Sequence, residues 1–128
     1  METVFLIFAS LAAIIHIYIF ILETFLWTKP IAKKAFGITH EHAEVTKEMA
    51  ANQGVYNGAI AGVVLVGIAF YVAYSSTIGY SLIFAGTGIM TAAAVYLFVS
   101  SPDKRSAAIK QLIFPLSALV VGVILSIL

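Results

Sequence analysis

The sequence predicts an all-α fold, an integral membrane bundle of four transmembrane helices in a single domain. Of its 128 residues, 62% are hydrophobic and 10% are charged, whereas a soluble domain carries roughly 25% charged residues. Four apolar runs are separated by polar segments, and each has about the 20 residues that a helix needs to cross the hydrocarbon core. The expected spans are about residues 3–26, 51–74, 78–99 and 109–128. A soluble chain of this length could not cover so much apolar surface, which excludes soluble enzymes.

The first span begins next to the initiating methionine. No Lys or Arg precedes it, and it contains His16 and Glu23. A cleaved signal peptide would have a basic start, a purely apolar centre and a small-residue cleavage site. The first span is therefore expected to stay in the protein.

The connection before the second span is the longest polar segment. A basic turn is expected between Lys29-Pro30 and Phe36-Gly37. Thr39 follows this turn and is placed to cap a short cytoplasmic helix that leads into the second span. A helix continuous from Thr39 to the end of that span would exceed the bilayer thickness by about 20 Å, at about 1.5 Å per residue.

The connection between the third and fourth spans carries a helix start signal. Ser101, Pro102 and Asp103 have the order of an N-cap, a first-position proline and an acidic first-turn residue. Pro115 lies inside the fourth span. It predicts a kink, because proline lacks a backbone donor and crowds the preceding turn.

The basic residues indicate the orientation in the membrane. All seven lie in two of the three connections, at Lys29, Lys33, Lys34, Lys47, Lys104, Arg105 and Lys110. Lys and Arg concentrate in cytoplasmic loops, so both termini are expected outside, in a multi-pass protein of the plasma (inner) membrane. The one-sided charge argues against a dual topology. Trp27, at the end of the first span, fits an aromatic residue of the membrane interface.

Charge and cysteine content exclude further classes. The formal net charge is +1, which offers no basic excess to attract a nucleic acid. The chain has no cysteine, so it has no disulfide, thiol nucleophile or thiolate metal site. No motif indicates a cofactor, and membrane lipid is the partner that the composition itself implies.

Glu23 is the residue that most needs an explanation, because an ionisable group inside a span is costly unless it faces a polar interior or a partner. His16 precedes it by seven residues, on the same helix face and about 10 Å away. Both are candidate catalytic residues, Glu23 as a general base or proton carrier and His16 as a second acid or base. Alternatively, Glu23 reaches the headgroups or pairs with Lys29, Lys33 or Lys34, and His16 makes one interhelical hydrogen bond.

The second span opens with an unusual density of polar side chains. If Trp27 and Gln53 lie at the same level, Asn57 lies at about the depth of Glu23 and can donate a hydrogen bond to its carboxylate. The candidate substrate-binding residues are therefore Asn57, Asn52, Gln53, Tyr56 and Trp27. The alternative is that the amides only hold helices together, a role worth about 0.6 to 2 kcal/mol each in membranes.

Gly54, Gly58 and Gly62 form a ladder of small residues, which lets another helix backbone approach closely. They are expected to serve helix packing. The partner can be the first or third span, or the second span of another copy in a homo-oligomer.

A metal site is only weakly indicated. His40 and Glu44 are spaced i, i+4, and imidazole with carboxylate suits zinc. Two ligands do not make a site, and a charged first turn beside a basic loop is usually a solvated face. No metal is predicted.

One combination of residues extends over nearly the whole chain, namely His16, Glu23, Trp27, Pro30, Phe36-Gly37 and the string from Ala51 to Gly58. Through these residues the chain resembles a bacterial family of small four-span membrane proteins that is catalogued as a domain of unknown function. Some members carry an automatic "epimerase" label. The resemblance implies the fold and the importance of these polar positions, and it implies no particular reaction.

The polar residues allow three functional hypotheses. The first is an enzyme or binder of a lipid-like or amphipathic small molecule, with its site between the first two spans and open to the cytoplasmic leaflet. The second is a small proton-coupled transporter or oligomeric channel that uses Glu23. The third is a structural or regulatory partner in a membrane complex. The first is favoured, because polar residues concentrate at one end of one helix pair.

Overall fold

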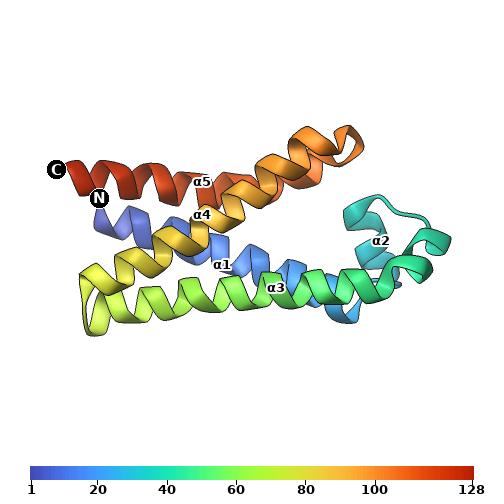
Figure 1. The fold of residues 1–128 in the computed structure, drawn as a ribbon, viewed down its shortest axis with the longest axis horizontal. Helices are drawn as coiled ribbons and strands as arrows, with labels where there is room; N and C mark the ends of the chain where they lie inside the picture. The colour runs from blue at the N-terminus through green and yellow to red at the C-terminus, as the bar shows by residue number, and fades with distance from the viewer.

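The computed structural model describes residues 1–128 and consists of helices joined by short connections (Figure 1). The elements are α1 (Glu2–Phe25), α2 (Pro30–Phe36), α3 (His40–Ala73), α4 (Ser76–Ser100), a 3-10 turn (Pro102–Lys104) and α5 (Arg105–Ile127). Four of the helical segments are long and apolar enough to cross a membrane. The predicted all-α bundle with four membrane-spanning helices is confirmed.

The four long helices pack in a ring. Helix α1 contacts α3 and α5, and α4 contacts the same two neighbours from the opposite side. Both chain termini lie at one end of the bundle, and α2 lies at the other, hereafter the α2 end (Figure 1). The side of the membrane that each end faces stays a prediction from charge.

The core is built from small residues around a few large ones. Ala9, Ala12 and Ala13 of α1 are completely buried, and Phe5 lies beside them. The ring of Phe5 packs against Tyr71 and Tyr80, with centroids 6.0 and 5.6 Å away. Alanine at these positions lets the helix backbones approach, which is how helices associate in lipid without a hydrophobic driving force.

Helix α2 replaces the basic turn that the sequence predicted, so that prediction was wrong. Lys29 is its N-cap, and Pro30 occupies its first position. Gly37 ends it in the left-handed conformation with φ 62°, and the Gly37 N–H donates to the Lys33 carbonyl. Proline at the start and glycine just after the end are the helix signals that the sequence carried here.

Helix α3 is one continuous helix of 34 residues. Thr39 caps it as predicted, because its side-chain oxygen accepts a hydrogen bond from the His42 N–H at 3.1 Å. The short helix expected before the second span is therefore the beginning of α3. At about 1.5 Å per residue α3 is about 50 Å long, against a hydrocarbon core of about 30 Å. Its first turns thus extend beyond the membrane-crossing part.

Substituting Thr39→Ala is expected to loosen the first turn of α3 and to lower the free energy of unfolding by about 1 kcal/mol. The cause is the loss of the acceptor for the His42 N–H. Thr39→Asp keeps a capping oxygen and serves as the matched control. Amide hydrogen exchange over residues 41–44 measures the effect. Equal protection in the alanine and aspartate variants would contradict the prediction.

The connection from α4 to α5 differs from its predicted form. The Ser101 hydroxyl makes no capping bond. Instead its carbonyl accepts from the Lys104 N–H at 2.9 Å, which closes a 3-10 turn before α5 begins at Arg105. Pro115 is buried inside α5, and the kink at Pro115 stays a prediction.

Two of the three ladder glycines lie where α3 meets α1. A Cβ at Gly58 would come within 2.9 Å of the Phe20 ring, and one at Gly54 would overlap the Thr24 hydroxyl. A Cβ at Gly62 would have no neighbour within 4 Å. The ladder therefore packs α3 against α1 through Gly54 and Gly58.

Candidate functional site

The centre of the candidate site is a hydrogen-bonded pair between α1 and α3. Asn57 Nδ2 donates to Glu23 Oε2 at 2.8 Å and also approaches the Gln53 carbonyl at 3.2 Å. Gly54 makes this approach feasible, because a Cβ there would lie 2.9 Å from the Glu23 Cβ. The sequence predicted this contact because Glu23 and Asn57 lie at about the same depth in neighbouring spans, and the structure contains it.

The second carboxylate oxygen of Glu23 is free. Oε1 accepts no hydrogen bond within the chain. The predicted alternative of an ion pair with Lys29, Lys33 or Lys34 is absent, since the only ion pairs are made by Glu44 with His40 and Lys47. Lys33 instead lies 3.4 Å from the His40 ring. Glu23 therefore has one oxygen held by Asn57 and one oxygen without a partner in the chain.

Glu23 lines a cavity of about 330 Å³ at the α2 end of the bundle, hereafter the Glu23 cavity. Residues from all five helices and from the 3-10 turn contribute to its wall. They are Ile19, Glu23, Trp27, Phe36, His42, Thr46, Met49, Ala50, Gln53, Leu97, Lys104 and Gln111. A concave site that combines polar groups with apolar walls is typical of small-molecule binding.

Trp27 joins three elements at the edge of this cavity. Its Nε1 donates to the Thr46 hydroxyl at 3.0 Å, and that hydroxyl donates to the His42 carbonyl at 2.7 Å. The indole ring packs against Phe36 of α2, with centroids 5.0 Å apart. Trp27 is therefore both a wall of the cavity and a link that fixes α2 and α3 to the end of α1.

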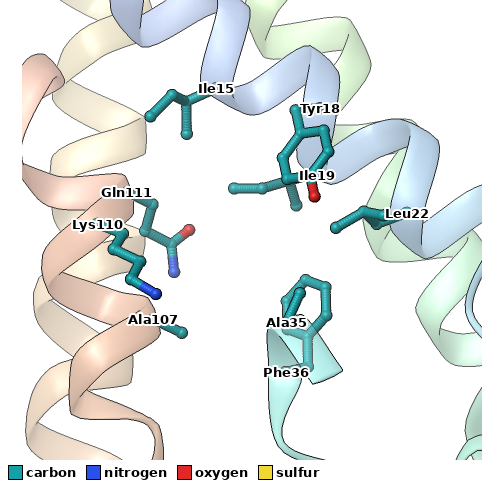
Figure 2. A pocket seen from close by; sticks show the side chains of 9 residues that line it. All are labelled: Ile15, Tyr18, Ile19, Leu22, Ala35, Phe36, Ala107, Lys110 and Gln111. Carbon is teal, nitrogen blue, oxygen red and sulfur yellow. The ribbon is translucent and has the colours of Figure 1, made fainter. Parts of the chain in front are cut away.

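A second cavity of about 260 Å³ lies between α1, α2 and α5, hereafter the α1–α2–α5 cavity. In Figure 2, side chains from α1 face those from α5 across an open space, with α2 at one end. Its lining residues are Ile15, Tyr18, Ile19, Leu22, Ala35, Phe36, Ala107, Lys110 and Gln111. Three of them also line the Glu23 cavity, namely Ile19, Phe36 and Gln111, so the two cavities adjoin.

The comparison with known families covers nearly the whole chain. The family described as Protein of unknown function (DUF1304) matches residues 10–123. The chain belongs to the DUF1304 family. The resemblance noted from the sequence is confirmed, and the matched region of this DUF1304 protein contains every residue that lines the two cavities. No curated protein and no solved structure matches the chain.

His16 of this DUF1304 protein lies apart from Glu23. It is 1% exposed, and its Nδ1 lies 2.9 Å from the carbonyl of Ala12 in the same helix. The predicted alternative of an interhelical hydrogen bond is therefore wrong. A carbonyl can only accept, so Nδ1 carries the proton, and in the neutral ring Nε2 is left as an acceptor. Glu23 stands two helical turns, about 10 Å, further along α1.

The other predicted polar residues divide into two groups. Gln53 lines the Glu23 cavity together with Trp27. Asn52 and Tyr56 are exposed and make no hydrogen bond to the Glu23–Asn57 pair. The structure therefore leaves both outside the cluster in which they were expected.

The weak metal candidates form an exposed pair. His40 Nε2 lies 3.9 Å from Glu44 Oε1, one helical turn along α3. No third His, Cys, Asp or Glu joins them in a group that could hold an ion. The pair is explained as an i, i+4 contact on a solvated helix face.

The contribution of α5 was not predicted from the sequence. Lys110 and Gln111 line the α1–α2–α5 cavity, and Gln111 also lines the Glu23 cavity. The sequence feature that could have indicated this contribution is Gln111, a side-chain amide near the start of an otherwise apolar span. Polar residues in such a position usually face the bundle interior or a cavity.

Proposed function

We propose that this DUF1304 protein binds a lipid-like or amphipathic small molecule in the Glu23 cavity and positions it for acid–base chemistry. The observation that carries the proposal is the state of the Glu23 carboxylate. One oxygen is held by Asn57 at 2.8 Å, and the other is free beside a cavity of about 330 Å³. A carboxylate with a fixed orientation and a free oxygen is equipped to accept a hydrogen bond or a proton from a ligand.

The cavity wall supports an amphipathic ligand. Its polar members include Glu23, Gln53 and Thr46, and its apolar members include Met49 and Leu97. A ligand head with a hydroxyl or amine donor would reach Glu23 Oε1, while an apolar tail would contact the aliphatic wall. His16 lies two turns deeper, so only an elongated ligand would contact both candidate acid–base residues.

The charge pattern supports access from the cytoplasmic side. All seven Lys and Arg residues belong to α2 and its N-cap, the start of α3, or the segment from the 3-10 turn into α5, and these segments lie at the α2 end (Figure 1). By the positive-inside rule this end faces the cytoplasm of a plasma (inner) membrane, with both termini outside. The ligand would then enter from the cytoplasm or the cytoplasmic leaflet.

Binding of 1-monolauroylglycerol, a neutral amphiphile with two hydroxyl donors, tests the proposal. The variant Glu23→Gln is nearly isosteric, and its amide oxygen can still accept from Asn57. The NH₂ group of the new glutamine then takes the place of Glu23 Oε1, so a hydrogen-bond donor replaces the acceptor that the ligand would use. We expect binding to weaken about 10- to 100-fold, because a hydrogen bond to a charged group contributes about 1.5 to 3 kcal/mol.

Native mass spectrometry of the protein released from detergent micelles measures the bound fraction at each ligand concentration. The matched control is Glu41→Gln, which removes an exposed carboxylate from the first turn of α3. We expect this control to bind like the parent protein. Equal affinity in Glu23→Gln and Glu41→Gln would overturn the proposed function.

A further inference from the structure

The α1–α2–α5 cavity has a chemistry different from that of the Glu23 cavity. Seven of its nine lining residues are hydrophobic, and Lys110 is its only charged side chain. No acidic residue lines it, and Lys110 makes no ion pair. The cavity therefore presents one unpaired cation beside an apolar space.

Two further polar groups in this cavity lack partners. The Tyr18 hydroxyl and the Gln111 amide line it and make no hydrogen bond within the chain. Figure 2 shows Tyr18 on the α1 side, with Lys110 and Gln111 on the α5 side. Lys110 and Tyr18 are exposed and Gln111 is half-buried, so all three groups can donate hydrogen bonds to a ligand with acceptor oxygens.

The cavity opens on the outer surface of the bundle. Tyr18 is 48% exposed, and exposed aliphatic side chains lie one turn before it in α1, at Ile14, and next to Lys110 in α5, at Ile109. Such aliphatic side chains on a membrane-crossing helix face lipid. The mouth of the cavity is thus bordered by the surface that contacts acyl chains.

Charge at this end of the bundle favours an anionic occupant. Lys33 and Lys34 lie in the last turn of α2, and Lys104 and Arg105 precede Lys110 at the start of α5. Basic residues beside the membrane attract anionic headgroups. The volume of about 260 Å³ is far above the roughly 10 to 15 Å³ that one water needs, so the space is large enough for part of an acyl chain.

We propose that the α1–α2–α5 cavity binds an anionic phospholipid of the surrounding bilayer. Its phosphate pairs with Lys110 and accepts from Gln111, and one acyl chain lies between α1 and α5 against Ile15, Ile19 and Leu22. This site does not rest on the proposed function, because its ligand pairs with Lys110 and the other ligand contacts Glu23, although the two cavities share Ile19, Phe36 and Gln111.

Native mass spectrometry with two lipids of identical acyl chains tests this site. Phosphatidylglycerol and phosphatidylcholine are each titrated into the detergent-solubilised protein. We expect the parent protein to prefer phosphatidylglycerol about five- to tenfold. Lys110→Gln should remove this preference, and Lys47→Gln, which changes an exposed lysine of α3 that does not line the cavity, should keep it.

A second variant tests the place of the acyl chain. Ala107 lines the cavity, and Ala107→Trp should fill it and weaken the binding of both lipids while circular dichroism stays unchanged. Glu23→Gln should leave phosphatidylglycerol binding unchanged, which separates this site from the proposed function. Retained preference in Lys110→Gln would overturn the proposal. So would displacement of phosphatidylglycerol by equimolar laurate, or a dimer that buries Lys110.

Discussion

Substituting Gly79→Ala is expected to destabilise the bundle more than alanine at any other glycine of the chain. A Cβ at Gly79 would overlap the backbone nitrogen and Cα of Tyr71, where α4 lies directly against α3. Overpacking usually costs about 1 to 3 kcal/mol when side chains can move aside. Here the obstacle is backbone, so one helix must shift as a whole. We expect a loss of at least about 3 kcal/mol in the free energy of unfolding.

A second glycine in the same helix provides the control. A Cβ at Gly88 would have no neighbouring atom within 4 Å, so Gly88→Ala gains helix propensity without a clash. We expect it to stabilise the protein by up to about 1 kcal/mol. Unfolding in mixed micelles with increasing dodecyl sulfate, followed by circular dichroism, compares the two. If both variants unfold at the same detergent fraction, the close approach at Gly79 is refuted.

These glycines show how far the fold could be predicted from the sequence. The four spans were predictable because each apolar run matches the bilayer thickness, and Thr39 was predictable from local capping chemistry. The face that each helix turns toward the bundle interior was not predictable. In lipid both faces of a span are apolar, so hydropathy does not distinguish the buried Val64 from the exposed Val63 and Leu65. For the same reason the spacing of glycines singled out Gly62 and left out Gly79.

The candidate site also has one part that the sequence predicts and another that it does not. The Glu23–Asn57 contact could be predicted, because it depends only on how deep each residue lies in two neighbouring helices that are joined by one connection. A site between the first two spans was predicted, but the parts of the cavity walls that α2 and α5 supply were not, because the sequence predicted a turn where α2 lies. The partner of His16 was missed because the ring bonds to its own helix at Ala12. A polar residue in a span signals that a partner exists without saying which one.

Substituting Asn57→Leu is expected to lower the free energy of unfolding by about 1 to 3 kcal/mol, because it leaves the part-buried Glu23 carboxylate without its donor. The double variant Glu23→Leu with Asn57→Leu should recover most of this loss. When both partners become apolar, no polar group remains unsatisfied, and such replacements are often nearly neutral. Gln53→Leu is the matched control, since Gln53 meets Asn57 only through its backbone carbonyl.

The double variant separates a structural role from a functional one. If the pair only holds α1 against α3, the double variant should behave like the parent protein in every measurement. If the pair positions Glu23 Oε1 for a ligand, the double variant should fold with near-parental stability and lose 1-monolauroylglycerol binding. Unfolding in mixed micelles and native mass spectrometry on the same preparations measure both quantities. Losses of stability that simply add in the double variant would contradict the coupling of Glu23 with Asn57, because residues in direct contact show a measurable interaction energy.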